Sequence, residues 1–405
     1  MGTEPASRLD TPVVSRRLGI RCAWHAGVAL LFFCLAPFDA WAETWMAGPT
    51  GAPMTLQAAV AAAKDGDTIE LLPGEYKGGL LIDQRRLTLR GMGAKPPVIN
   101  GAGKVSPTHA LWIVRGGEVT LENLEFRGAR APDRSGGAVR HEGGRLTVNN
   151  CGFFDNESGI VSTKDETAEL RISGSVFAGS PREEGGLFHL LNVGRIGKLE
   201  IVGSRFQQGF EGHLIKSRAR ENLITYNFIH DGVRGSASYE IEIAAGGVAT
   251  ILGNVIGQGL NTGNRVVLAY GSEGQSWDRN ELYVAHNTFV NYGWSPAWFM
   301  RVFDERLKGP VVVEAINNLL VGPGFFWLAA SGHFDGNRHV TRGMLRDIWT
   351  NGFELPLDSI WRGAGIDPSN IRGRALAPKA EFELPANVRE LKGGARSWTP
   401  GAYQR

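Results

Sequence analysis

One stretch of the sequence, residues 209–247, holds most of the side chains whose types and spacing could do chemistry. A lysine among arginines could accept a proton, because nearby positive charge favours the neutral amine. Carboxylates two residues apart on one strand lie roughly 7 Å apart and could instead act as an acid and base pair. The candidate catalytic residues are Lys216, Arg218, His213, Tyr239, Glu240 and Glu242.

Further side chains in and beyond this stretch could hold a substrate beside those groups. The candidate substrate-binding residues are Arg220, Arg234, Arg265, Tyr270, Glu273 and Arg301. An acidic partner would be held by this local basic cluster, because the chain as a whole carries little net charge. No zinc site is predicted, since His141, His189 and His286 fall far apart without close ligand spacing.

The composition excludes several classes of protein. The chain has 405 residues, of which 55 are glycine and 42% are apolar. It is too apolar for a disordered chain, and its glycines lack the three-residue period of collagen. The formal net charge of +2 gives no broad basic field, so no nucleic-acid partner is predicted.

Residues 1–42 are predicted to be a secretory signal peptide. Arg16, Arg17 and Arg21 precede a short apolar run, and Ala40-Trp41-Ala42 supplies the small residues of a cleavage site. The mature chain is therefore expected in the periplasm or secreted, without a membrane span and as a monomer. The sequence leaves open whether the general secretory or the twin-arginine route exports it.

A degenerate repeat runs through most of the mature chain. Its units have alternating aliphatic residues, then Asn or Gly, and then a large apolar residue, as in LTVNNCGF and LYVAHNTF. Such alternation, bounded by turn residues, indicates short β-strands. The large apolar residue recurs every 23 to 33 positions, at Phe126, Phe153, Phe177, Phe206, Ile229, Ile256, Phe289 and Leu320.

A second strand precedes most of these units, and no helix separates the two. The pattern predicts an all-β, single-domain parallel β-helix, a solenoid in which each coil hydrogen-bonds to the next at ~4.8 Å. A β-sandwich, whose strands come at similar intervals, is the alternative. In the coil, one set of amides is expected to stack inside a turn: Asn123, Asn150, Asn227, Asn254, Asn287 and Asn318.

The open ends of such a coil need covers, because exposed sheet edges recruit other strands. Residues 43–76 are predicted to form an N-terminal strand and a capping helix with Thr55 as its N-cap. Residues 77–332 are predicted to form the parallel β-helix. Residues 333–405 are predicted to be an irregular tail packed on the body, with one short helix at MLRDIWTNGF.

Strand alternation predicts that part of the candidate site lies on neighbouring coils. If Ile215 and Ile241 point inward, Lys216 and Glu242 point outward on adjacent strands. A carboxylate beside the lysine would pair with it and oppose proton acceptance. The alternative without a function is a solvated Lys–Glu pair on a β-surface, which contributes little.

The segment TLQAAVAAAKDGDTIELLPGEY resembles the opening of secreted right-handed β-helix proteins of the pectin-lyase-like superfamily, above all chondroitinase-B and alginate-lyase relatives. The closing TPGAYQR is similar to the ending of many bacterial β-helix proteins. The resemblance implies a right-handed parallel β-helix. It says little about chemistry.

The strand IKS, residues 215–217, resembles the strand that carries the lysine base in the chondroitinase-B and alginate-lyase group. The resemblance implies that Lys216 takes the C5 proton of a uronate in a β-elimination. The sequence differs from that group in two features. The Glu-x-Glu calcium ligands of the group precede its lysine, whereas EIE, residues 240–242, follows Lys216 here. The Arg-His-Gly motif of the group is absent. No cofactor is therefore predicted, and the sequence leaves open whether calcium is bound.

The sequence thus predicts an exported polysaccharide-active protein that cleaves an acidic glycan by β-elimination in a groove on an exposed sheet. Two alternatives stay open. One is a glycan-binding or assembly scaffold without catalysis. The other is a glycoside hydrolase, in which Glu240 and Glu242 work with Asp231 or Glu273.

Overall fold

The described part of the protein, in a computed structural model, begins at Ala42, so the expected signal peptide lies outside the described residues. The described residues are 42–404, apart from residues 84, 104–108, 184, 275–276, 329–330, 351 and 394–396. None of the helices in them is long and apolar enough to cross a membrane.

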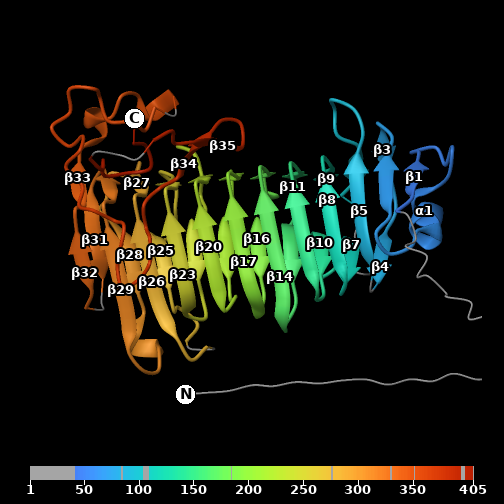
Figure 1. Cartoon of the computed structure of the whole chain (residues 1–405), viewed down its shortest axis with the longest axis horizontal. Coiled ribbons are helices and arrows are strands. Elements are labelled where there is room, and N and C mark those ends of the chain that lie inside the picture. Colours follow the sequence, from blue (N-terminus) through green and yellow to red (C-terminus); the bar gives the residue numbers. More distant parts are fainter. Residues whose placement is uncertain are drawn as a thin grey trace, which may run out of the picture. The chain divides into compact units, whose positions relative to one another are not determined.

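Three long parallel sheets, here named A, B and C, make up the body (Figure 1). Sheet A runs in the order β1 (Thr44–Ala47), β2 (Thr68–Leu71), β5 (Arg86–Gly91), β8 (Glu118–Glu122), β11 (Arg145–Asn149), β14 (Asp165–Ser173), β17 (Ile196–Val202), β20 (Glu221–Thr225), β23 (Gly247–Leu252), β26 (Asn280–Ala285), β29 (Val311–Ile316) and β32 (His333–Asp335).

Sheet B contains β3 (Glu75–Tyr76), β6 (Val98–Asn100), β9 (Glu125–Arg127), β12 (Gly152–Phe154), β15 (Val176–Ala178), β18 (Arg205–Gln207), β21 (Phe228–His230), β24 (Val255–Gln258), β27 (Thr288–Asn291), β30 (Leu319–Val321) and β33 (Arg338–Val340). Sheet C contains β4 (Leu80–Asp83), β7 (Ala110–Arg115), β10 (Gly137–His141), β13 (Ser158–Ser162), β16 (Leu191–Val193), β19 (Ile215–Ser217), β22 (Ile241–Ile243), β25 (Val266–Tyr270), β28 (Ala297–Val302) and β31 (Gly324–Leu328). Successive strands of the chain pass from C to A to B and back to C, so the chain winds as a coil and the solenoid prediction is confirmed.

The core lies inside the coil and is built from the recurring large apolar residues. The rings of Phe126, Phe153, Phe177 and Phe206 stack with centroids 5.1, 4.4 and 4.7 Å apart and with nearly parallel planes. All four side chains are buried. The repeat therefore places one large apolar residue per coil in a continuous apolar column, and this burial fixes the register between coils.

A second buried column consists of asparagines in the turn between sheets A and B. The Nδ2 of Asn227 donates to the Oδ1 of Asn254 at 3.0 Å, and the same bond joins Asn254 to Asn287 and Asn287 to Asn318. Asn337, beyond the predicted set, extends the column at 2.9 Å. These amides satisfy each other and the backbone inside the coil.

Asn123 and Asn150 do not belong to this column, so that part of the prediction is wrong. Both occupy the preceding turn position, which has a left-handed backbone with φ of 52° and 50°. Asparagine tolerates this conformation, and Gly174 and Gly203 occupy it on the next two coils. The interior position beside it holds other residues on the early coils, beginning with Leu124.

The first coils are covered by the helix α1 (Leu56–Ala62), which contacts β1 and β2. The hydroxyl of Thr55 caps the helix by accepting the N–H of Ala58 at 3.1 Å, as predicted. Leu56, Ala59 and Val60 are its buried residues. The helix thus turns its apolar side to the core.

The tail crosses the outer face of sheet B at the other end of the coil (Figure 1). Phe353 and Phe382 pack there on Phe228, with ring centroids 5.7 and 5.5 Å apart. The antiparallel pair β34 (Ala380–Glu383) and β35 (Asn387–Glu390) belongs to this segment. Instead of one short helix, the tail has the 3₁₀ turns η2 (Arg342–Met344) and η3 (Ile348–Thr350), because backbone bonds between Asp347 and Gly352 close the chain into a tight turn. A third such turn, η1 (Asp304–Arg306), follows β28.

Candidate functional site

The outward face of sheet C presents one residue per coil in a straight row. The strand register aligns Asn192 with Lys216, Lys216 with Glu242, Glu242 with Ala269, and Ala269 with Arg301. The aliphatic residues that flank this row are buried, as alternation requires. The predicted placement of Lys216 beside Glu242 is therefore found in the structure.

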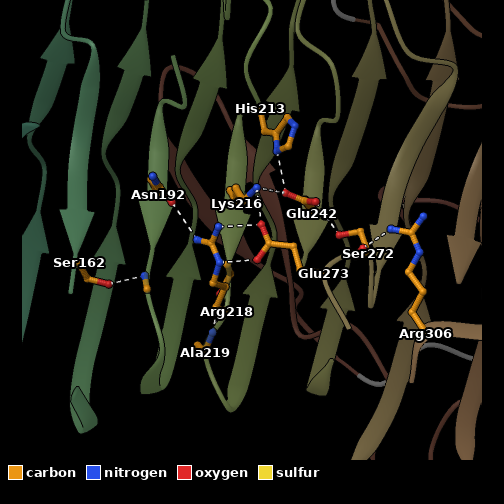
Figure 2. A network of polar contacts seen from close by, with 12 residues as sticks. Ser162, Asn192, His213, Lys216, Arg218, Ala219, Glu242, Ser272, Glu273 and Arg306 are labelled. Carbon is orange, nitrogen blue, oxygen red and sulfur yellow. Dashed lines mark hydrogen bonds and ion pairs between the residues drawn. The ribbon is translucent and has the colours of Figure 1, made fainter. Parts of the chain in front are cut away.

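Glu242 is the hub of the cluster of side chains on this face (Figure 2). Its Oε2 lies 2.9 Å from the Nδ1 of His213 and 3.0 Å from the Nζ of Lys216. Its Oε1 accepts the hydroxyl of Ser272 at 2.6 Å. Only 4% of its side chain is exposed, so three groups surround a carboxylate that is nearly removed from water.

Glu273 extends the cluster from the turn after β25. Its Oε1 lies 2.8 Å from the Nζ of Lys216, which therefore sits between two carboxylates. Arg218 donates to both oxygens of Glu273, from Nε at 2.6 Å and from a terminal nitrogen at 2.8 Å. Arg218 also donates to the side chain of Asn192 at 3.2 Å. The bidentate pair gives the cluster a fixed geometry.

The charges of the cluster are reflected in its pKa values. Burial alone would raise the pKa of Glu242, but the contact with His213, the hydroxyl of Ser272 and the charge of Lys216 together lower it to about 2. Burial likewise opposes the shift at Glu273, where Arg218 and Lys216 lower the pKa. Both carboxylates are therefore ionised at neutral pH, and they balance the two cations.

A column of three rings borders the cluster. The rings of His189 and His213 have centroids 4.6 Å apart, and Tyr239 packs edge-on against His213 at 4.8 Å. Burial, followed by the charges of His213 and Lys216, lowers the pKa of His189 to about 3. The neutral His189 accepts the backbone N–H of His213 through Nδ1 at 2.9 Å. This bond ties the backbone of His213 to the preceding coil.

Five of the six candidate catalytic residues are thus brought together, namely His213, Lys216, Arg218, Tyr239 and Glu242. Glu240 is the exception, because its carboxyl is fully buried and has no hydrogen-bond partner among the described residues. Burial, and after it the charge of Asp231, raises the pKa of Glu240 well above its ordinary value. The strand β22 begins only at Ile241, so the alternation that turns Glu242 outward does not extend back to Glu240.

The candidate substrate-binding residues are more scattered. Glu273 joins the cluster and Arg301 lies in the same outward row, paired with Glu305 at 3.3 Å. Tyr270 instead points into the core, where its hydroxyl donates to the carbonyl of Gly247 at 2.5 Å. This inward position removes it from any surface site.

The remaining three arginines lie elsewhere on the surface. Arg220 contacts Glu166 at 3.6 Å and lies over the ring of Trp277. Arg265 is exposed at the start of β25, and Arg234 lines a pocket near sheet B. The structure does not bring these three to the carboxylate hub.

Three members of the cluster were not expected from the sequence: Ser272, Asn192 and His189. Ser272 and Asn192 were missed because their partners Glu242 and Arg218 lie 30 and 26 residues away along the chain. His189 had a signal, since FHLL, residues 188–191, and GHLI, residues 212–215, place a histidine before the same strand position. Repeat alignment would have paired the two rings.

Calcium does not fit this cluster. Its two carboxylates are bridged by the ammonium of Lys216 and clamped by Arg218, so a bound cation would have to displace both. Among the residues that the structure describes, no group of three or more His, Cys, Asp or Glu side chains is placed to hold a metal ion. No metal-dependent step is assigned to these residues.

No protein-family model matches the chain, and no curated protein does either. Among solved structures, pectate lyase Pel9A is similar with a TM-score of 0.63 and 14% identity, over 90% of this chain and 96% of that chain. The PL6 family alginate lyase AlyGC gives a TM-score of 0.38 and 17% identity, over 74% of this chain and 40% of that one. Escherichia coli ybhC gives a TM-score of 0.28 and 14% identity, over 79% of this chain and 89% of that chain. The likeness to Pel9A, together with the three stacked sheets, shows that this chain has the right-handed parallel β-helix fold.

Proposed function

We propose that this protein acts on an acidic polysaccharide at the exposed face of sheet C and cleaves it by β-elimination. The supporting observation is that an imidazole, an ammonium, a guanidinium and two carboxylates lie within ion-pair distance on three adjacent coils. The substrate class is supported by Pel9A, a pectate lyase that shares the fold over nearly its whole length.

A β-elimination makes three demands on a site. The proton on C5, beside the carboxylate of the sugar, must be removed, and the pair of electrons it leaves forms a C4=C5 double bond. The bond from C4 to the bridging oxygen breaks, and that oxygen takes up a proton. The site therefore needs a proton acceptor, cations for the carboxylate and a proton donor.

We assign the proton acceptor to His213. The Oε2 of Glu242 lies 2.9 Å from the Nδ1 of its ring, an ion-pair contact without hydrogen-bond geometry. A carboxylate this close stabilises the positive charge that an imidazole gains when its other nitrogen takes a proton. The Nε2 of His213 has no hydrogen-bond partner among the described residues and is available to substrate. Tyr239, packed against His213, is the proposed donor to the leaving oxygen.

Lys216 and Arg218 are assigned to the carboxylate of the sugar. The two carboxylates beside Lys216 attract its positive charge, so the structure favours a cationic role over the proton acceptance that the resemblance implies. Arg218 presents a planar guanidinium on the same side, and such a group binds carboxylates well. A bound uronate would compete with Glu273 for both cations.

A non-catalytic glycan-binding protein is the second candidate. The observation that favours it is that each cation of the cluster is already neutralised by a carboxylate, as in a purely structural network. Hydrolysis by paired carboxylates is less favoured. Its general acid must be protonated, whereas Glu242 and Glu273 are both ionised and Glu240 is buried.

The test is to incubate the full chain with polygalacturonate, alginate, a glycosaminoglycan and a neutral glucan. An unsaturated product absorbing in the near ultraviolet is expected from an acidic polymer. His213→Gln should lower kcat by about 100-fold or more, and Lys216→Met should mainly raise KM. Arg90→Met is the control, because Arg90 pairs with Glu122 on sheet A, away from the cluster.

Three outcomes separate the candidates. Product formation that survives His213→Gln would refute the assignment of the acceptor. New reducing ends without ultraviolet absorbance would indicate hydrolysis. Glycan binding without any product would refute catalysis and support the binding protein.

A further inference from the structure

A second candidate site lies where the tail meets sheet B, and none of its residues belongs to the cluster on sheet C. It is a pocket of about 350 Å³, a size in the range of small-ligand sites. Its walls come from β18, β21, the loop that follows β21 and the tail turn η3, together with the segments that follow β15 and β27. The residues used below are Arg182, Arg205, Gln207, Asp231, Arg234 and Trp349.

Three arginines give the pocket its positive charge. Arg182, Arg205 and Arg234 all line it. Burial raises the pKa of Asp231 and the charge of Arg182 opposes that shift, so these two groups interact. Asp231 is the only carboxylate in the lining. Three guanidiniums and one carboxylate leave a net charge of +2 when Asp231 is ionised.

Arg205 is the most constrained of the three. Its guanidinium lies 5.5 Å from the centre of the Phe228 ring, and its Nε is buried without a hydrogen-bond partner among the described residues. Burial lowers the pKa of Arg205, which shows that its charge is partly removed from water. Such a charge is costly without a counter-ion, and an anionic ligand in the pocket would supply one.

Asp231 interacts with the charge of Arg182, and no ion pair joins it to Arg205. The protein backbone binds its oxygens. They accept the N–H of Gly209 at 2.6 Å and the N–H of Ala237 at 2.9 Å. These bonds hold the loop that carries Arg234. Burial raises the pKa of Asp231 to about 6, so its negative charge is lost as the pH falls below that value.

The other lining groups fit a sugar better than a bare oxyanion. Trp349 presents an indole that is 59% exposed, and its ring is packed 5.3 Å from that of Tyr292. Its backbone N–H donates to the side chain of Asp347, a bond that holds the turn carrying the ring. Gln207 and Gln208 add amides that can both donate to and accept from hydroxyls. Aromatic faces commonly pack against the apolar faces of ring-shaped ligands.

We propose that this pocket binds an acidic sugar unit, with its carboxylate at Arg205 and Arg234 and its ring against Trp349. The site is separate from sheet C and does not depend on catalysis there. It would hold one end or branch of an acidic glycan on the side of the coil that the tail covers.

The experiment is isothermal titration of the full chain, at low salt and pH 7, with glucuronate, galacturonate, neutral methyl glucoside and sulfate. Either uronate is expected to bind, and the neutral sugar is not. Arg205→Met, which keeps the aliphatic stem on Phe228, and Arg234→Met, at an exposed position, should each weaken binding about tenfold or more, since a lost charge-assisted bond costs roughly that much.

Arg90→Met, on sheet A, serves as the matched control and should leave uronate binding unchanged. Lys216→Met reports any uronate that binds on sheet C. Loss of binding in Lys216→Met but not in the two arginine variants would place the ligand on sheet C and overturn the proposal. So would the absence of uronate binding, or sulfate binding as tight as that of the sugar acids. Circular dichroism establishes whether each variant is folded. If Arg205→Met does not fold, Arg234→Met alone still tests the proposal.

Discussion

Glu240 and Glu242 lie two residues apart, and their ionisation should affect stability in opposite directions. Against the effect of burial, the contacts of Glu242 lower its pKa from an ordinary value of 4.5 to about 2. Burial and the charge of Asp231 raise the pKa of Glu240 well above the same value. Replacing each by glutamine isolates the two effects, because the amide keeps the size of the side chain and removes the titration.

For Glu242 the folded state favours the ionised form. The difference between a pKa of 4.5 and one of about 2 corresponds to about 3 kcal/mol of stability at neutral pH. This contribution is complete above the unfolded pKa and is lost as the pH falls from about 4.5 towards 2. For Glu240 the effect of ionisation on stability has the opposite sign, because the folded state retains a proton that the unfolded chain has released. Its cost is therefore absent at low pH and grows as the pH rises above about 4.5.

The assay is urea unfolding of the wild type, Glu240→Gln and Glu242→Gln between pH 2.5 and 8, followed by tryptophan fluorescence. Glu242→Gln should be less stable than the wild type by about 3 kcal/mol at pH 7, and the difference should shrink below pH 4.5. Glu240→Gln should gain stability relative to the wild type as the pH rises. Glu305→Gln, at a half-exposed pair, is the control and should change little.

Parallel pH curves for Glu240→Gln and Glu242→Gln would refute this reasoning. They would show that the two side chains share one environment, contrary to the fully buried Glu240 and the outward-facing, ion-paired Glu242 described above. A difference between Glu242→Gln and the wild type that stays constant down to pH 2.5 would equally contradict stabilisation of the ionised carboxylate.

Three further predictions concern the coil and the cation cluster. Asn254→Ala removes a middle rung of the buried amide ladder, with its bonds to the asparagines on both neighbouring coils, and should lower the free energy of unfolding in urea by about 3 kcal/mol or more. Asn123→Ala, in the outer turn position, should lower it less. Phe177→Ala opens the phenylalanine column and should cost about 3–5 kcal/mol, against a smaller loss for the less buried Phe154→Ala; equal losses would contradict the stacked core. Chelation with EGTA should leave cleavage unchanged, because Lys216 already occupies the space between the carboxylates, and activity that depends on added calcium would disprove this.

The fold could be predicted from sequence because its determinants are local and repeated. Alternating aliphatics define which face of each strand is buried, and one large apolar residue per coil then leaves a single register that keeps the column inside. That register is what places Lys216 opposite Glu242. This pair of the candidate site therefore follows from periodicity alone.

The turns could not be predicted in the same way. Asn123 looked equivalent to the ladder asparagines, yet it occupies the neighbouring left-handed position, and one residue of offset moves a side chain from the interior to the surface. Glu240 lies just before its strand begins, so strand alternation does not predict whether its side chain is exposed or buried.

The amino-acid sequence by itself determined the coil, its capping helix and the outward row on sheet C, because these depend on hydrophobic periodicity that each segment carries. Only the tertiary structure decided which charged groups meet: it brought Glu273 and Ser272 to Lys216 and Glu242, and it formed the arginine pocket against the tail. The physical reason is that burial energy fixes strands to within one residue, whereas contacts among polar side chains depend on turn conformations and on segments more than a hundred residues apart.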